Sequence, residues 1–162
     1  GFLMRTSTGS PDANGTLRMT YGEIRGYSPA DALQSGPITT IRGVIEKTTG
    51  TEPFNTPARV IELAKKGEFG RLASRKLKTL PVCLLYNLDT TGGNSGSPLL
   101  NAAGELVGVN FDRAYGATIN DFAWDESYSR SIAVDIRYVL WMTAKVAGAD
   151  HLIREMGVGS LE

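Results

Sequence analysis

The sequence predicts a mainly β fold with helical structure at its C-terminal end. Three observations lead to this prediction: runs of alternating, β-branched residues, turns rich in Gly, Ser, Asn and Pro, and one apolar stripe at helical spacing near the C-terminus. The 162 residues suffice for one domain with a hydrophobic core. Small β-barrels that carry a terminal helix have this pattern.

Strands are expected where apolar and polar residues alternate or where β-branched residues dominate. Residues 1–15 are polar and rich in Gly, Ser, Thr and Pro, so we expect a flexible lead-in segment there. The C-terminal hairpin should turn at Asn101–Gly104. The expected strands are residues 16–27 (TLRMTYGEIRGY), 37–47 (PITTIRGVIEK), 80–88 and 130–134, with the hairpin at residues 98–112 (PLLNAAGELVGVNFD).

Helices are expected where capping residues flank an apolar periodicity. Residues 58–66 should form a helix that Gly67 ends. Asp135 should cap a second helix over residues 136–148, which the segment ADHLIREM extends or follows. The apolar stripe of this second helix comprises Ile136, Val139, Leu140 and Val146.

The composition excludes several classes of partner. Lys+Arg and Asp+Glu each total 17, so no excess of charge points to a nucleic acid or an anionic membrane. The longest apolar runs stay far below the roughly 20 residues of a membrane span. No cluster of metal-ligating residues is present, and neither a metal nor another cofactor is expected. The single cysteine, Cys83, lies in the apolar run PVCLLY and is expected in the core.

The turn TTGGNSGSP, residues 90–98, is the candidate for chemistry because it places a serine between glycines. A nucleophilic serine must stand free on a tight turn, with a base for its proton and donors for the oxyanion. Ser95 meets the first need, and the backbone N–H groups of Gly93 and Ser95 meet the third. The α/β-hydrolase motif would need glycine at Ser97, and a phosphate-binding loop would need Gly-Lys-Ser/Thr. A β-turn without chemistry is the alternative interpretation.

The segment DTTGGNSGSPLLNAAGELVGVNFD resembles the nucleophile segment of chymotrypsin-fold serine peptidases. Its GNSGSP form is similar to that of glutamyl endopeptidases and bacterial dipeptidyl-peptidases. The second likeness also takes in PDANGTLRMTYGEIRGYSP, GVIEKTTGTEPFNTP, NFDR and SRSIAVDIRYVLWMTAKVAGADHLIREM, in order over nearly the whole chain. The chain thus resembles the C-terminal portion of a bacterial serine dipeptidyl-peptidase of the acidic-specific type (dipeptidyl-peptidase 11-like).

The resemblance implies a chymotrypsin-like (trypsin-like serine protease) fold of two β-barrels, with the active site between them and an inserted helical cap. The triad histidine and aspartate come from the first barrel and the serine from the second. Residues 16–135 would then be the second β-barrel, and residues 136–158 a C-terminal α-helical segment. The family's nucleophile falls on Ser95, and its oxyanion donors fall on the backbone of Gly93 and Ser95.

The resemblance also assigns substrate-binding residues. The aspartate that helps to hold the free amino terminus of the substrate falls on Asp112, beside Asn110 and Phe111. The next position is glycine in general dipeptidyl-peptidases and arginine in the acidic-specific type, and here it is Arg113. Because a guanidinium pairs with a carboxylate through two hydrogen bonds, substrates with Asp or Glu as second residue are expected. A solvated pair at a strand end is the alternative for Asp112 and Arg113.

The sequence provides no base for the nucleophile. His151, the one histidine, follows Ser95 by 56 residues and is expected to be a surface or packing residue. In the chymotrypsin order, histidine and aspartate precede serine, so the chain alone should be almost inactive. Asp89 occupies the place of the acidic pocket base of trypsin-like enzymes. Its D-x-x-G-G context resembles the glutamyl endopeptidases instead, so a structural role in the turn is expected.

The expected partners follow from this resemblance. They are peptides with free N-termini and the missing first barrel and helical cap of the same enzyme, whose loss would expose apolar surface and so also allow a homodimer. No nucleic acid and no membrane is expected, and the likeness implies the periplasm, the cell surface or secretion from a bacterium. The alternatives are a general dipeptidyl-peptidase, a glutamyl-type endopeptidase fragment, and a non-catalytic barrel that binds peptides.

Overall fold

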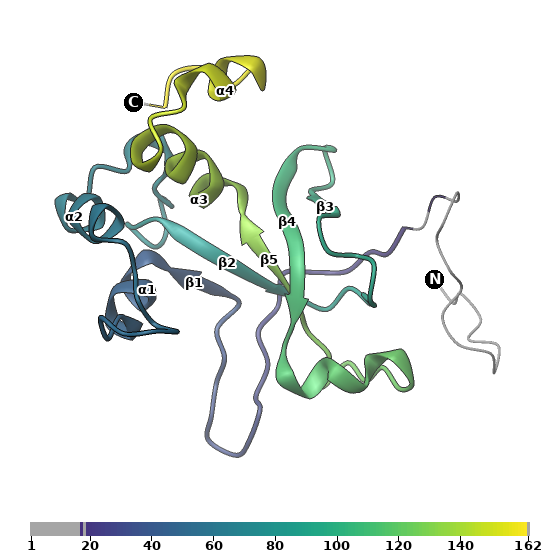
Figure 1. The fold of residues 1–162 in the computed structure, drawn as a ribbon. Coiled ribbons are helices and arrows are strands. Elements are labelled where there is room, and N and C mark those ends of the chain that lie inside the picture. Colours follow the sequence, from purple (N-terminus) through teal and green to yellow (C-terminus); the bar gives the residue numbers. More distant parts are fainter. Residues whose placement is uncertain (1–16, 18, 162) are drawn as a thin grey trace.

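The computed structural model describes residue 17 and residues 19–161, so the flexible segment predicted at residues 1–15 lies outside the described part. Within that part, five strands form one antiparallel sheet in the order β1-β2-β5-β4-β3 (Figure 1). A mainly antiparallel sheet with a few helices confirms the mainly β prediction. The strands are β1 (Ile38–Thr40), β2 (Pro81–Tyr86), β3 (Pro98–Leu100), β4 (Leu106–Arg113) and β5 (Ser131–Asp135).

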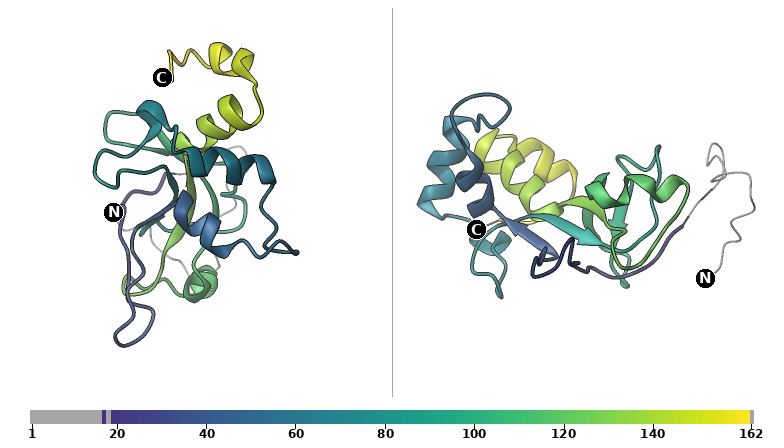
Figure 2. Two further views of the ribbon diagram at one scale, coloured as in Figure 1. Left: turned by 90° about the vertical axis from the view of Figure 1, so that its left-hand side faces the viewer. Right: turned by 90° about the horizontal axis from the view of Figure 1, so that it is seen from below.

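The helices are short, and most of them gather at the β1/β2 end of the sheet, as Figure 1 and both views of Figure 2 show. The 3₁₀ helix η2 is the exception, because it follows β4 at the other end. In the described ranges, no helix is long and apolar enough to cross a membrane. The helical elements are α1 (Ile41–Lys47), α2 (Ala58–Lys66), η1 (Gly70–Leu72), η2 (Tyr115–Asp121), α3 (Ile136–Trp141), its π-helical continuation η3 (Met142–Val146) and α4 (Asp150–Glu155).

The strand predicted at residues 37–47 is wrong beyond its first residues. β1 ends at Thr40, and α1 begins at Ile41. Ile41 and Val44 are three residues apart and pack into the same apolar cluster, which is the spacing of one helix face. The β-branched run at the start of this segment therefore concealed a helical face that follows it.

The strand predicted at residues 16–27 is also wrong where the structure describes it. The segment makes only isolated bridges, at Ile24 and Tyr27, and no continuous ladder. It passes close to its neighbours: a Cβ on Gly26 would clash with the carbonyl oxygen of Ser35. Alternation alone predicts a half-buried extended chain, but a strand also needs a partner along its length.

The later elements agree with the sequence prediction. β2 and β5 lie at the predicted positions, and α2 ends at Gly67 with a φ of +69°. The hairpin turns where Asn101 donates its backbone N–H to the Glu105 carbonyl at 3.0 Å. The Asp135 carboxylate accepts the backbone N–H of Arg137 at 2.9 Å and so caps α3.

The main core lies between the helices and the β1/β2 end of the sheet. Trp141 is 1% exposed and packs edge-on against Phe69 at 6.0 Å and stacked on Tyr138 at 6.1 Å between ring centroids. The buried residues of this helical core are Ile41, Val60, Leu63, Phe69, Leu72, Leu80, Val82, Trp141, Ile153 and Leu161. A second, smaller cluster lies nearer β3 and β4 and consists of Leu84, Tyr86, Leu99 and Ala133.

Candidate active site

The glycine-rich turn forms a tight, exposed corner between β2 and β3. Gly93 and Gly96 have φ values of +93° and +87°, a region that favours glycine. A Cβ on either residue would meet no atom within 4 Å, so backbone conformation rather than crowding explains the two glycines. The corner is held by Asn94, whose N–H donates to the Thr91 carbonyl at 3.2 Å and whose side-chain oxygen accepts the Thr91 N–H at 2.9 Å.

Ser95 lies exposed at the tip of this corner. Its hydroxyl donates to the Phe111 carbonyl at 3.4 Å, a long hydrogen bond that leaves the oxygen open to solvent. Among the described residues, the backbone N–H groups of Gly93 and Ser95 have no hydrogen-bond acceptor. An exposed hydroxyl with two unused main-chain donors has the components of a serine nucleophile with its oxyanion hole.

A β-bulge in β4 lies directly against this corner. β4 and β5 pair Asn110 with Ala133 but Asp112 with Ile132, so Phe111 is an extra residue in the ladder. Bulges re-aim side chains and are frequent beside active sites. Here the bulge carries the carbonyl that accepts from Ser95, and it brings the next two residues to the same edge of the molecule.

Asn110 lies beneath the corner and links it to the core. It is 7% exposed, and its Nδ2 donates to the Asn94 carbonyl at 3.1 Å. Its Oδ1 accepts the hydroxyl of Tyr86, a fully buried residue of β2. Burial raises the pKa of this tyrosine well above its usual value, so the hydroxyl is a donor at all ordinary pH. Both ends of the Asn110 amide are therefore engaged in supporting the turn.

Arg113 ends β4 and is anchored on two sides. Its Nη1 and Nη2 each donate at 3.0 Å to one oxygen of Asp121 in η2, and Nη1 also reaches the Thr90 carbonyl at 3.5 Å. Thr90 is the first residue of the glycine-rich turn, so the guanidinium and Ser95 are attached to the same corner. The Asp121 carboxylate raises the pKa of Arg113 above its usual range, and the charges of Asp89 and Asp112 act in the same direction.

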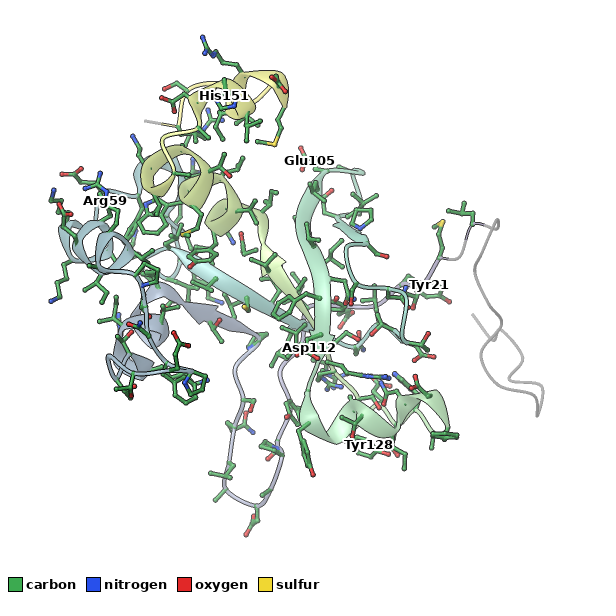
Figure 3. The ribbon with its side chains drawn as sticks, in the orientation of Figure 1. Tyr21, Arg59, Glu105, Asp112, Tyr128 and His151 are labelled. Carbon is green, nitrogen blue, oxygen red and sulfur yellow. The ribbon has the colours of Figure 1, made fainter. Side chains whose placement is uncertain are left out.

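The remaining predicted substrate residues lie on the open side of β4. Asp112 is exposed, and one of its carboxylate oxygens accepts the backbone N–H of Arg113 at 2.8 Å. Phe111 is 48% exposed beside it. Figure 3 shows Asp112 at the junction of β4 and η2. Asp89 is exposed at the start of the turn and interacts electrostatically with Arg113.

No histidine lies near the corner in the part of the chain that the structure describes. His151 is exposed on α4, well apart from Asp112 (Figure 3). Cys83 is half-buried in β2, and burial raises the pKa of its thiol. The described residues also contain no group of three His, Cys, Asp or Glu side chains that could hold a metal ion.

Three supporting residues were not predicted from the sequence: Thr90, Tyr86 and Asp121. Thr90 shares a 2.6 Å hydrogen bond with Ser131 beneath the turn, and this pair spans 41 positions of the sequence. Asp121 follows Arg113 by eight residues in a segment with no recognised motif. These pairings depend on tertiary contacts, and no local pattern indicates them.

The chain is similar to known proteins over most of its length. The sequence matches the peptidase S46 family over residues 2–158. It is 49% identical over 147 residues to an Asp/Glu-specific dipeptidyl-peptidase of Capnocytophaga gingivalis, with 90% of this chain and 20% of the relative covered. It is 45% identical over 150 residues to a dipeptidyl-peptidase 7 of Phocaeicola vulgatus, with 92% of this chain and 21% of the relative covered.

The fold is also similar to a solved structure. The crystal structure of Porphyromonas endodontalis DPP11 in complex with the dipeptide Arg-Asp matches with a TM-score of 0.87 and 39% sequence identity, and the match covers 97% of this chain and 23% of that one. The chain spans about a fifth of the length of the curated relatives that it matches in sequence. On the extent of these matches, the chain belongs to the peptidase S46 family.

Proposed function

We propose that the chain is the nucleophile-bearing part of a serine dipeptidyl-peptidase that releases N-terminal dipeptides with Asp or Glu as second residue. The observation on which this rests is the attachment of Arg113 to the same corner as Ser95, through the Thr90 carbonyl. A cation next to an exposed serine on a glycine-rich turn suits a substrate whose scissile bond follows an acidic residue. Relatives named Asp/Glu-specific dipeptidyl-peptidases support the assignment.

In this proposal the chain is the second barrel of a two-barrel enzyme. The chain covers about a fifth of its relatives, so other segments of the protein can provide the triad histidine and aspartate. With such a base, the Ser95 hydroxyl loses its proton and attacks the carbonyl carbon of the second residue. The amine of the third residue then leaves with a proton from the histidine, and water hydrolyses the acyl-enzyme. The backbone N–H groups of Gly93 and Ser95 stabilise the oxyanion in both steps.

Specificity comes from two charged contacts with the substrate. Asp112, exposed at the end of β4, binds the ammonium group of the substrate in this proposal, which restricts cleavage to the amino terminus. Arg113 meets the carboxylate of the second residue. Truncating one partner of a buried charged pair typically costs about 2–5 kcal/mol, enough for strong discrimination against neutral side chains. Asn110 holds the corner from below and acts on the substrate only through this support.

A general dipeptidyl-peptidase is the second candidate, because the chain is also 45% identical to a protein named dipeptidyl-peptidase 7. Arg113 separates the two candidates, since general enzymes of this type are expected to carry glycine at that position. A location in the bacterial periplasm or at the cell surface is part of the proposal and follows only from likeness to such enzymes.

The proposal is tested by replacing Arg113→Gly in the full-length protein that contains this chain. We expect the ratio of kcat/KM for Asp- or Glu-containing over Leu-containing dipeptidyl reporters to fall by about 100-fold, because the charged partner of the acidic side chain is removed. Activity towards the neutral reporter should persist. Initial rates with the two reporters measure both quantities.

Arg59→Gln serves as the matched control for this experiment. Arg59 is also an arginine paired with a carboxylate, Glu62 at 3.1 Å, but it lies on the solvent-facing side of α2, away from the corner. This variant should leave the preference for acidic residues unchanged. An acidic preference that survives Arg113→Gly would contradict the assignment of the specificity pocket.

A further inference from the structure

Three of the five N–H donors of Arg113 are engaged within the chain. Nη1 and Nη2 hold the two oxygens of Asp121, each at 3.0 Å, and Nη1 also reaches the Thr90 carbonyl at 3.5 Å. An arginine guanidinium presents five N–H donors in a rigid planar fork. Asp121 thus takes the end of the guanidinium formed by its two terminal nitrogens.

The other edge of the guanidinium is unused. Among the described residues, Nε–H has no acceptor, and Nη2 donates only to Asp121. Nε–H and the second Nη2 hydrogen point to the same side, and together they form a second two-donor fork that fits a carboxylate. With 20% of its surface exposed, the Arg113 side chain is not sealed by the protein. Arg113 can therefore hold Asp121 and a second carboxylate at once.

Asp121 itself is firmly placed. It is the last residue of η2, and the residue before it, Asn120, is fully buried. Asn120 accepts the Ser129 hydroxyl at 2.7 Å through its side-chain oxygen. The 3₁₀ helix η2 is held at its start as well, where the Ala114 N–H donates to the Arg130 carbonyl at 2.8 Å. These contacts hold the backbone at Asp121 in place beside Arg113.

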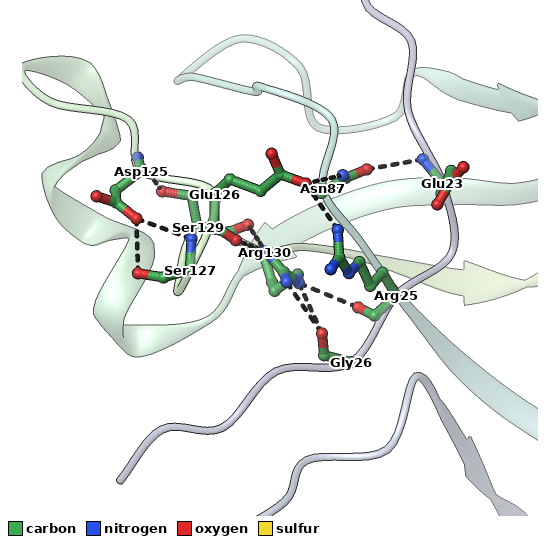
Figure 4. A network of polar contacts seen from close by, with 9 residues as sticks. All are labelled: Glu23, Arg25, Gly26, Asn87, Asp125, Glu126, Ser127, Ser129 and Arg130. Carbon is green, nitrogen blue, oxygen red and sulfur yellow. Dashed lines mark hydrogen bonds and ion pairs between the residues drawn. The ribbon is translucent and has the colours of Figure 1, made fainter.

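The loop that follows Asp121 is tied down by a polar network, shown in Figure 4. Arg130 is buried, and its guanidinium donates to the carbonyl oxygens of Gly26 and Glu126 at 2.8–3.1 Å. The Glu126 side chain pairs with Arg25 at 2.7 Å. These contacts attach the loop that follows Asp121 to the segment that contains Arg25 and Gly26.

We propose that Asp121 is a positioning residue for substrate specificity: it fixes the guanidinium of Arg113 so that the Nε/Nη2 edge receives the acidic side chain of the substrate. This inference rests on the function proposed above. A free arginine side chain loses rotamer entropy when it binds a carboxylate, and an arginine that is already held loses less. Asp121 also places a negative charge near the incoming carboxylate, and the orientation of the fork outweighs this repulsion.

The opposite role would be competition, in which Asp121 occupies the substrate's place and must leave before binding. The two roles predict opposite changes in KM for acidic reporters when the Asp121 carboxylate is removed. In the full-length enzyme, Asp121→Asn should raise KM for acidic reporters by about 10- to 100-fold, because a misdirected group can cost that much, while kcat and the neutral reporter change little. Asp121→Glu should restore part of the loss. A lower KM for acidic reporters in Asp121→Asn would establish competition and overturn the proposal.

A double-mutant cycle separates positioning from a general effect on the fold. In an Arg113→Gly background, Asp121→Asn should have no further effect on the ratio of acidic to neutral cleavage, since its target is absent. Glu62→Gln is the matched control: it removes an exposed carboxylate that pairs with Arg59 and Lys66 at the other end of the molecule. This control should leave every parameter unchanged.

The outcomes distinguish this inference from the proposed function. If the wild-type enzyme prefers acidic reporters and Asp121→Asn does not change that preference, the positioning role is wrong and the proposed function stands. The positioning role is also wrong if Asp121→Asn lowers the ratio of acidic to neutral cleavage equally in the wild-type and the Arg113→Gly backgrounds. If the wild-type enzyme has no acidic preference, the proposed specificity fails, and the role of Asp121 fails with it.

Discussion

The two ends of the sheet differ in how they are stabilised. At the β1/β2 end, the helical elements other than η2 cover a cluster of ten buried apolar residues within the described chain, centred on Trp141. At the β3/β4 end, only four buried apolar residues form the cluster, and hydrogen bonds among Asn94, Asn110 and Tyr86 hold the turn instead. The first end is closed by its own helices, whereas the second presents exposed polar groups.

The end with the larger buried cluster contributes most to stability, and the other end carries the candidate site. The helical end contains the larger cluster of buried apolar side chains, which attaches the helices to the sheet. The β3/β4 end, called the open end below, contains the exposed serine, the bulge and Arg113 with the carboxylates around it. Binding and catalytic residues commonly lie on loops positioned by such a scaffold. We therefore expect substitutions at the two ends to affect different measurements.

The largest effect on stability is expected at the helical end. Trp141→Ala should lower the free energy of unfolding of the chain by about 3–5 kcal/mol, because it empties a buried site that contacts Phe69 and Tyr138. Denaturant unfolding measures this change. Trp124→Ala is the matched control at the open end, where the tryptophan is only half-buried and its Nε1 has no partner in the described chain. Equal losses in the two variants would contradict the contrast between the ends.

A smaller effect is expected beneath the turn. Tyr86→Phe removes the hydroxyl that Asn110 accepts and leaves a buried amide oxygen without its donor, at a cost of about 1–2 kcal/mol in unfolding free energy. In the full-length enzyme, kcat should fall as well, because the corner that holds Ser95 is loosened. Tyr138→Phe, in the helical end, should change both quantities much less. A normal kcat in Tyr86→Phe would show that the corner keeps its geometry without this bond.

The fold could be predicted from sequence where the signals are local. The glycine at the end of α2, the aspartate cap of α3 and the hairpin turn at Asn101 depend on neighbouring residues, and the structure contains all three. The first two expected strands fail because alternation does not show whether a partner strand is present. The sequence also did not single out Trp141, since its burial depends on how η1 and α3 meet.

In the candidate site too, local features could be predicted from the sequence and features that depend on tertiary contacts could not. Ser95 and Gly93 could be singled out as a candidate nucleophile and donor because they lie in one short turn, which the structure forms as an exposed corner. Arg113 could be predicted only through a resemblance to a known family. Its partner Asp121 could not, because the intervening residues fold into a 3₁₀ helix that returns the carboxylate to the strand. The burial of Asn110 likewise depends on the register of β4 against β5.

The most direct test of the nucleophile assignment compares three proteins with one reporter that releases an Asp-containing dipeptide. The full-length enzyme should cleave it, and its Ser95→Ala variant should be slower by about 10⁴-fold or more, as expected when a triad nucleophile is removed. The 162-residue chain alone should be close to inactive, because its one histidine, His151, lies on α4 and no triad histidine stands beside Ser95 in the described residues. Cleavage by the Ser95→Ala variant within tenfold of wild type, or by the isolated chain at a comparable rate, would contradict the assignment.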